Sequence, residues 1–179
     1  MSAWDECIVT LFVQDMKEEK LPMKYFKEYI IQDSIYLKNY VRVYGKAIYY
    51  AETLREIQFY YSILNFVTDT ESVIRLNYLR QFGMTNDDIE FIDPLPENQN
   101  YIDFLFEIAE YGNGYEILMA VLPRTLSYIY MFRKPAEEPE SRRSGYLDLI
   151  QDNVDDPYAE MLNELIEKVI MREGEGWRE

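Results

Sequence analysis

The chain has 179 residues and a formal charge of −15 at pH 7, and 48% of its residues are apolar. This length favours a single domain over residues 1–179, and an aromatic content of 16% indicates a chain that buries a large core. The sequence contains no histidine, which excludes haem held by a proximal His and every Ser-His or Cys-His catalytic arrangement.

Composition also narrows the expected partners and compartment. The acidic balance argues against nucleic acid, because phosphate binding needs a basic surface. The longest apolar stretch, 117–123, is far shorter than the ~20 residues that span a bilayer, so we expect no membrane partner. The single cysteine, Cys7, fits a reducing compartment. We therefore expect a soluble, cytoplasmic protein with no metal and no cofactor.

Apolar residues recur at helical spacing along nearly the whole chain, which predicts an all-α protein. The expected helices span about 3–19, 23–66 with a break near Gly45, and 70–82, followed by one turn at 85–88. A proline turn at 93–96 then precedes helices over about 97–111 and 115–132, of which the second is the most apolar and is expected at the centre of the fold. A charged loop at 134–143 and helices over about 144–153 and 156–171 follow.

A carboxylate interrupts the apolar face of the 23–66 helix. Asp33 lies in the middle of a stripe with helical spacing, and Tyr36 neighbours it; the stripe comprises Phe26, Ile30, Asp33, Leu37, Tyr40 and Tyr44. A carboxylate that faces a core costs several kcal/mol unless it is paired or hydrogen-bonded. Asp33 is therefore expected to have a partner, supplied by the protein or by a ligand.

The 115–132 helix carries a matching interruption. Arg124 follows Ile117 and Val121 on one face, and Tyr128 comes one turn later. Arg124 is thus the most obvious side chain to meet Asp33, and its guanidinium can present a bidentate fork to a carboxylate. Tyr101, Leu105 and Ile108 form the expected inward face of the preceding helix. The tyrosine-rich faces favour either a pocket for a flat ligand with polar edges or an ordinary aromatic core.

Three segments resemble motifs of TenA/thiaminase II proteins. Residues 20–40, with Asp33 and Tyr36, resemble the family's "LP…F..Y..QD..YL" helix. Residues 116–128, with Leu122-Pro123-Arg124, resemble its "A.LPC…Y" helix, and residues 146–150 resemble its "Y..WI" segment. The three motifs stand in the family's order, so the resemblance covers about residues 20–170.

The resemblance implies a haem-oxygenase-like bundle of helices without haem, assembled as a homo-oligomer, either a dimer or a tetramer. It also implies chemistry on aminopyrimidines in thiamin salvage, or cleavage of thiamin itself. By this resemblance Asp33 is the aspartate that binds the aminopyrimidine, and Tyr36, Tyr101 and Tyr128 are pocket tyrosines.

Two departures from the family pattern leave the activity open. By the same resemblance, Arg124 stands where the family has its nucleophilic cysteine, and we expect this sequence to lack the helix that carries the family's catalytic glutamate. The expected loss of the last helix also favours oligomerisation, because a bundle that lacks one helix leaves an apolar face that a second copy can cover.

Three hypotheses follow. In the first, the protein hydrolyses an aminopyrimidine, with Asp33 orienting the substrate, Glu71 as general base and Arg124 stabilising developing charge. In the second, it is a non-catalytic relative in which Asp33, Tyr36, Tyr101, Arg124 and Tyr128 bind an aminopyrimidine-like ligand, or in which Arg124 closes the pocket by pairing with Asp33. In the third, it is an unrelated helical interaction module.

Overall fold

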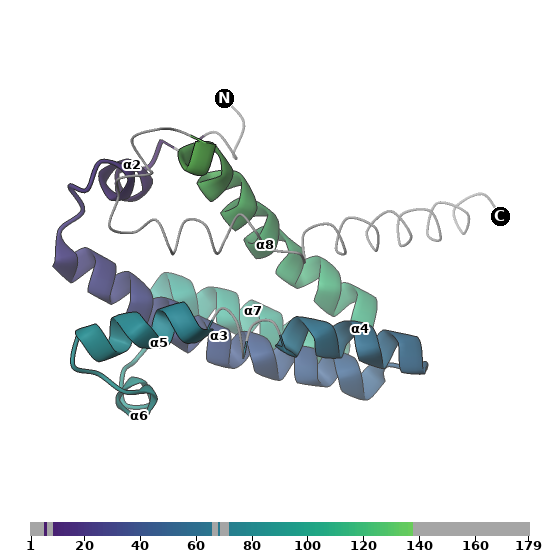
Figure 1. The fold of residues 1–179 in the computed structure, drawn as a ribbon. Coiled ribbons are helices and arrows are strands. Elements are labelled where there is room, and N and C mark those ends of the chain that lie inside the picture. Colours follow the sequence, from purple (N-terminus) through teal and green to yellow (C-terminus); the bar gives the residue numbers. More distant parts are fainter. Residues whose placement is uncertain (1–5, 7–8, 66–67, 69–71, 138–179) are drawn as a thin grey trace.

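The computed structural model describes residues 6, 9–65, 68 and 72–137. All regular elements in this part of the chain are helices (Figure 1), which confirms the predicted all-α class. They are α2 (Leu11–Lys17), α3 (Met23–Tyr50), α4 (Leu54–Asn65), α5 (Ser72–Gln81), α6 (Asn86–Ile89), α7 (Pro96–Tyr111) and α8 (Gly114–Glu137).

The central element is α3, and not the 115–132 helix as the sequence suggested. α3 contacts every helix from α4 to α8, whereas α8, which crosses the bundle obliquely in Figure 1, packs on α3 and α7. The reason is that α3 is buried around most of its circumference: four consecutive residues, 34–37, are all buried. Apolar content alone therefore misidentified the central helix, because tyrosines and small polar residues also line the core.

The break predicted near Gly45 lies instead at residues 51–53. Gly45 continues α3 without interruption, and the chain turns only after Tyr50. The new helix begins with a reciprocal cap in which Thr53 Oγ1 accepts from Glu56 N at 3.2 Å and Glu56 Oε2 accepts from Thr53 N at 3.1 Å. This capping pair, which the sequence analysis overlooked, fixes the boundary more strongly than a helical glycine does.

Two other predicted boundaries also change. The 3–19 helix is interrupted, because Thr10 adopts an extended conformation (φ −61°, ψ 143°) and α2 begins only at Leu11. α8 continues through Pro123 to Glu137, so residues 134–137 of the predicted loop are helical. The rest of that loop and the helices expected at 144–153 and 156–171 lie outside the described residues.

The middle of the chain follows the prediction closely. α5 ends before Gly83, which has a φ of 69°, and α6 starts at a capping box in which Thr85 Oγ1 accepts from Asp88 N at 3.3 Å. In α7, Leu105 is buried as expected, but the most buried positions beside it are Ile102 and Ala109, so the face is rotated slightly from the predicted one.

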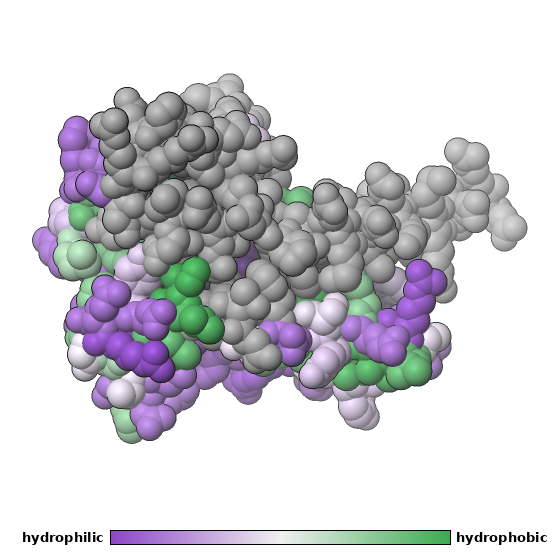
Figure 2. Space-filling model, viewed as in Figure 1, coloured by the Kyte–Doolittle hydropathy of each residue, from purple (hydrophilic) through white to green (hydrophobic). Residues whose placement is uncertain are grey.

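The described surface and helices bear on the expected partners. Figure 2 shows hydrophilic residues over much of the described surface on this side, with smaller hydrophobic patches between them. No helix in the described part of the chain is long and apolar enough to cross a membrane. The single domain and the homo-oligomer stay predictions.

Candidate functional site

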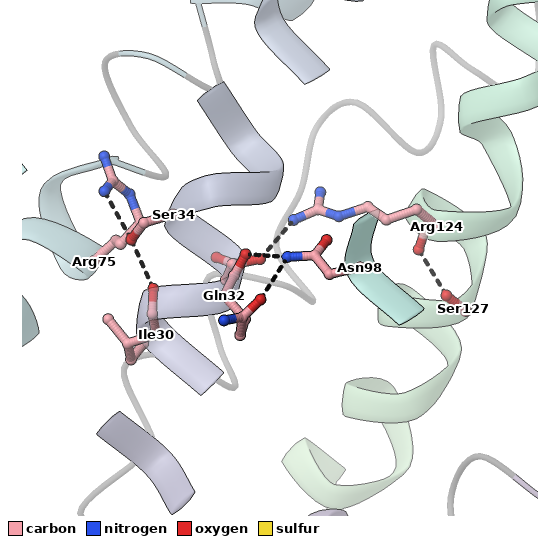
Figure 3. Close-up of polar contacts among 8 residues, drawn as sticks. Ile30, Gln32, Ser34, Arg75, Asn98, Arg124 and Ser127 are labelled. Atoms are coloured by element: carbon pink, nitrogen blue, oxygen red, sulfur yellow. Dashed lines mark hydrogen bonds and ion pairs between the residues drawn. The ribbon is translucent and has the colours of Figure 1, made fainter. Parts of the chain in front are cut away.

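Asp33 of α3 and Arg124 of α8 form an ion pair, as the sequence predicted. Arg124 Nη2 lies 3.9 Å from Asp33 Oδ1, and each side chain is only 12% exposed. In Figure 3 the Arg124 side chain extends from α8 toward α3. The distance exceeds the range of an N–H···O hydrogen bond, so this contact is a charge pair and not the bidentate fork considered from the sequence.

Two tyrosines of α3 and one of α7 surround this pair. The Tyr36 ring stacks on the Tyr101 ring with an interplanar angle of 4° and a centroid distance of 5.8 Å, and it packs at 5.5 Å against Tyr40. The guanidinium carbon of Arg124 lies 5.6 Å from the Tyr36 ring centroid and 5.8 Å from that of Tyr40. The Arg124 charge is therefore held by a carboxylate and by two aromatic faces.

Tyr101 connects α7 to α8 at the same place. Its hydroxyl donates to the carbonyl oxygen of Ala120 at 2.9 Å. Burial, assisted by nearby Tyr40, raises the pKa of Tyr101, although the Arg124 charge and a hydrogen bond with Tyr36 act in the opposite direction. Tyr101 consequently stays protonated at neutral pH and serves as a hydrogen-bonding group, not as a base.

A polar contact beside Asp33 fixes the position of α7. Gln32 Oε1 accepts from Leu95 N at 2.9 Å and from Asn98 Nδ2 at 3.0 Å, and Asn98 Nδ2 also donates to the Gln32 carbonyl oxygen at 2.9 Å (Figure 3). Asn98 lies one turn before Tyr101, so this contact sets where the Tyr101 ring meets Tyr36.

The sequence analysis missed these positioning residues for a physical reason. A glutamine next to a stripe and an asparagine in a first helical turn are ordinary surface patterns, and nothing in their spacing indicates that they meet. Tyr40 is different: it lies on the Asp33 stripe, one turn from Tyr36, and could have been included among the site residues.

A cavity of about 700 Å³ lies between α2 and the first half of α3. Its lining includes Phe12 and Val13 of α2, Tyr29 and Gln32 of α3, and Met131 of α8. This volume is in the range of small-molecule sites, and most of the lining is apolar. The cavity is thus large enough for a small molecule, but neither Asp33 nor Arg124 is among its described lining residues.

The structure does not describe the side chains of the other two predicted site residues. Glu71 is not among the described residues, and Tyr128 lies on α8 one turn after Arg124, with its side chain outside them. Their roles stay predictions. Within the described part of the chain, no group of three or more Cys, Asp or Glu side chains is placed to hold a metal ion.

The chain is similar in sequence to two curated proteins that share a name. The chain is 25% identical over 117 residues to an aminopyrimidine aminohydrolase of Halalkalibacterium halodurans, covering 65% of this chain and 52% of that protein. It is 24% identical over 145 residues to an aminopyrimidine aminohydrolase of Helicobacter pylori, covering 81% and 67% respectively. The chain thus spans between about half and two thirds of the length of these curated relatives.

The fold comparison gives the same result. A TenA family transcription regulator from Silicibacter sp. TM1040 superposes with a TM-score of 0.83 at 22% identity, covering 95% of this chain and 76% of that one. This likeness confirms the haem-oxygenase-like helical fold. The TENA/THI-4/PQQC family matches residues 1–171, a range that includes every helix that positions Asp33, Tyr101 and Arg124, and the chain therefore belongs to that family.

Proposed function

We propose that the Asp33 site binds an aminopyrimidine-like small molecule of the kind that occurs in thiamin salvage. The observation that carries this proposal is the mostly buried Asp33 carboxylate, which faces Arg124 at 3.9 Å beside the stacked rings of Tyr36 and Tyr101. A carboxylate in such a place is costly unless it has a specific binding partner.

The chemistry of an aminopyrimidine fits these groups. When the ring nitrogen next to the amino group is protonated, the two present parallel N–H donors that match the two oxygens of a carboxylate. The Arg124 guanidinium packs against the rings of Tyr36 and Tyr40, so a heterocycle that replaces Arg124 meets the same aromatic rings. Arg124 pairs with the carboxylate in this structure, so the proposed binding requires the ligand to replace Arg124 at Asp33.

Hydrolysis of the ligand is the second candidate, and it is favoured by the names of two relatives, both aminopyrimidine aminohydrolases. Arg124 is not a nucleophile, because its guanidinium remains protonated at all relevant pH values. Cys7, the only cysteine of the chain, is far from Arg124 in the sequence. We therefore propose binding without covalent catalysis at Arg124, and we retain Glu71 as the base that hydrolysis requires.

Calorimetric titration tests the binding proposal. We expect hydroxymethyl-aminopyrimidine to bind the wild-type protein and to lose measurable binding in Asp33→Asn, which keeps the size of the side chain and removes its charge. Asp93→Asn, an exposed position, is the matched control and should bind like wild type. Equal affinity in Asp33→Asn and wild type contradicts the proposal.

Ammonia release from an aminopyrimidine tests the hydrolysis candidate separately. If the protein turns over, Asp33→Asn should abolish the reaction because the substrate is no longer oriented. Turnover that survives this substitution places the chemistry elsewhere in the protein.

A further inference from the structure

We infer that the cavity between α2 and the first half of α3 is a second binding site, which takes a primary ammonium joined to an apolar body, such as an arylalkylamine. In Figure 1, α2 and the C-terminal half of α8 lie on the same side of α3, and residues of all three helices line the cavity. The inference goes beyond the function proposed for Asp33, because that residue does not line this cavity.

The walls of the cavity favour a ligand with an apolar body. Most of the residues that the structure describes around it are apolar, and they include Leu11, Phe12, Leu95 and Met131. Leu11 and Leu95 are 80% and 46% exposed, so a ligand in the cavity would cover apolar surface that now contacts water. The volume of about 700 Å³ is in the range that holds a small molecule.

The charged groups at the cavity select a cation. Asp15 of α2 and Glu28 of α3 are the charged side chains among its described lining residues, and both are acidic. Gln32 Nε2 lies 3.5 Å from Glu28 Oε1, so the Glu28 carboxylate is directed toward another residue of the lining. A primary ammonium brings three N–H donors to such carboxylates, whereas an anionic ligand is repelled by them. Two acids on a surface are ordinary; this pair differs because it borders an apolar cavity.

An aromatic ring at the cavity already accepts an ammonium group. Lys24 Nζ lies 4.5 Å from the centroid of the Tyr25 ring, and Tyr25 is one of the lining residues. The ring is therefore accessible to a cation, and Tyr25 as a whole is 53% exposed. A ligand ammonium at this place meets competition from Lys24, and removing the lysine charge should strengthen its binding.

Calorimetry with four probes at low salt tests the inference: phenylbutylamine, phenylbutanol, phenylbutyrate and ethylamine. We expect wild type to bind phenylbutylamine about fivefold more tightly than phenylbutanol, which is the size of effect that partly exposed charge pairs give. Phenylbutyrate should bind more weakly than phenylbutanol because of its charge, and ethylamine should bind weakly because it lacks the apolar body. Higher salt should reduce the preference for the amine.

Variants of the two acids locate the ammonium. The preference for the amine should shrink in Asp15→Asn and in Glu28→Gln and disappear in the double variant, and it should grow in Lys24→Gln. Phenylbutanol should bind the double variant as it binds wild type, which shows that the cavity is intact. Glu107→Gln, at an exposed position of α7, is the matched control and should keep the wild-type preference.

The results that overturn the inference are distinct from those that concern Asp33. Equal affinity of wild type for phenylbutylamine and phenylbutanol overturns it, and so does a preference for the amine that survives the double variant. Asp33→Asn should bind phenylbutylamine as tightly as wild type does. Loss of the amine in that variant places it at the other site and also overturns the inference. Each of these results is independent of whether a pyrimidine binds at Asp33.

Discussion

Two arginines approach α3 from different sides and meet it at neighbouring residues. Arg75 of α5 donates to Ser34 Oγ at 3.0 Å and to Asn86 Oδ1 at 3.2 Å, while Arg124 of α8 lies 3.9 Å from Asp33 (Figure 3). The first contact joins a charge to neutral oxygens within hydrogen-bonding distance. The second joins two opposite charges at a longer distance, against aromatic rings.

This difference distinguishes an arginine that holds the fold from one that, in the proposed function, gives up its carboxylate to a ligand. The short bonds of Arg75 tie α5 and the start of α6 to α3, and Ser34 is itself anchored by a 2.6 Å bond to the Ile30 carbonyl oxygen. Arg124 is held by charge and ring faces, which tolerate a change of partner better than directed hydrogen bonds do. The same residue type thus takes two roles, set by its neighbours.

The strongest test of this comparison is unfolding by denaturant. Arg124→Met should lower the free energy of unfolding by about 3 kcal/mol, because it leaves the mostly buried Asp33 carboxylate without its arginine. Adding Asp33→Asn should restore part of that loss, since the second change removes the charge that Arg124 neutralised. The double variant should therefore be more stable than Arg124→Met alone.

The other arginine should behave in the opposite way. Arg75→Met should cost about 1.5–3 kcal/mol, the usual loss for hydrogen bonds with a charged donor. Adding Ser34→Ala should give no recovery, because a neutral hydroxyl leaves no stranded charge. The distinction between the two sites is contradicted if Ser34→Ala restores stability to Arg75→Met. It is also contradicted if Asp33→Asn restores none to Arg124→Met.

Substitutions at two glycines, one after α5 and one inside α3, should change the stability of the protein by smaller amounts. Gly83 ends α5 with a φ of 69°, where an added Cβ is strained, so Gly83→Ala should destabilise the protein by about 1 kcal/mol. Gly45→Ala, inside α3 with nothing within 4 Å of the added Cβ, should stabilise it by about 0.5–1 kcal/mol. Thermal unfolding measures both, and neither change should alter pyrimidine affinity; an altered affinity in Gly83→Ala couples the two sides of α3.

The contact between Asp33 and Arg124 could be predicted because helical spacing is a strong constraint. A carboxylate and a guanidinium that interrupt two apolar stripes each need a partner. This requirement predicts the contact between Asp33 and Arg124 that the structure contains. The same reasoning could not give the geometry of the contact. Whether a charge pair closes as a fork or stays at 3.9 Å depends on the crossing of α3 and α8, which side-chain spacing does not encode.

Two features of the fold that the sequence analysis did not predict depend on polar side chains. The boundary between α3 and α4 and the position of α7 depend on specific polar contacts, those of Thr53 with Glu56 and of Gln32 with Asn98. The first is a local pattern that could be found from spacing, whereas the second joins residues 66 positions apart. Periodicity predicts which faces are buried, but it does not predict which polar side chains lock two helices in register.

The smallest expected difference between Arg124 and Arg75 is their effect on the pKa of Tyr101. Burial raises the pKa of this hydroxyl, and the positive charge of Arg124 lowers it by stabilising the phenolate. Arg124→Gln should therefore raise the pKa of Tyr101 further, whereas Arg75→Gln, on the other side of α3, should leave it unchanged. Alkaline titration of the phenolate absorbance, with Tyr101→Phe subtracted in each background, isolates this one hydroxyl among the tyrosines.

The same shift has a consequence for stability. A tyrosine whose pKa is higher in the folded than in the unfolded protein contributes stability that is complete below the unfolded value of about 10 and is lost as the pH rises through the folded value. In Arg124→Gln the contribution of Tyr101 should persist to higher pH than in wild type, while Tyr60, whose pKa burial raises to about 12, should contribute equally in both proteins. If the Tyr101 titration is the same in Arg124→Gln and Arg75→Gln, the Arg124 charge does not act on the ring cluster, and its assignment to the ligand site loses its electrostatic basis.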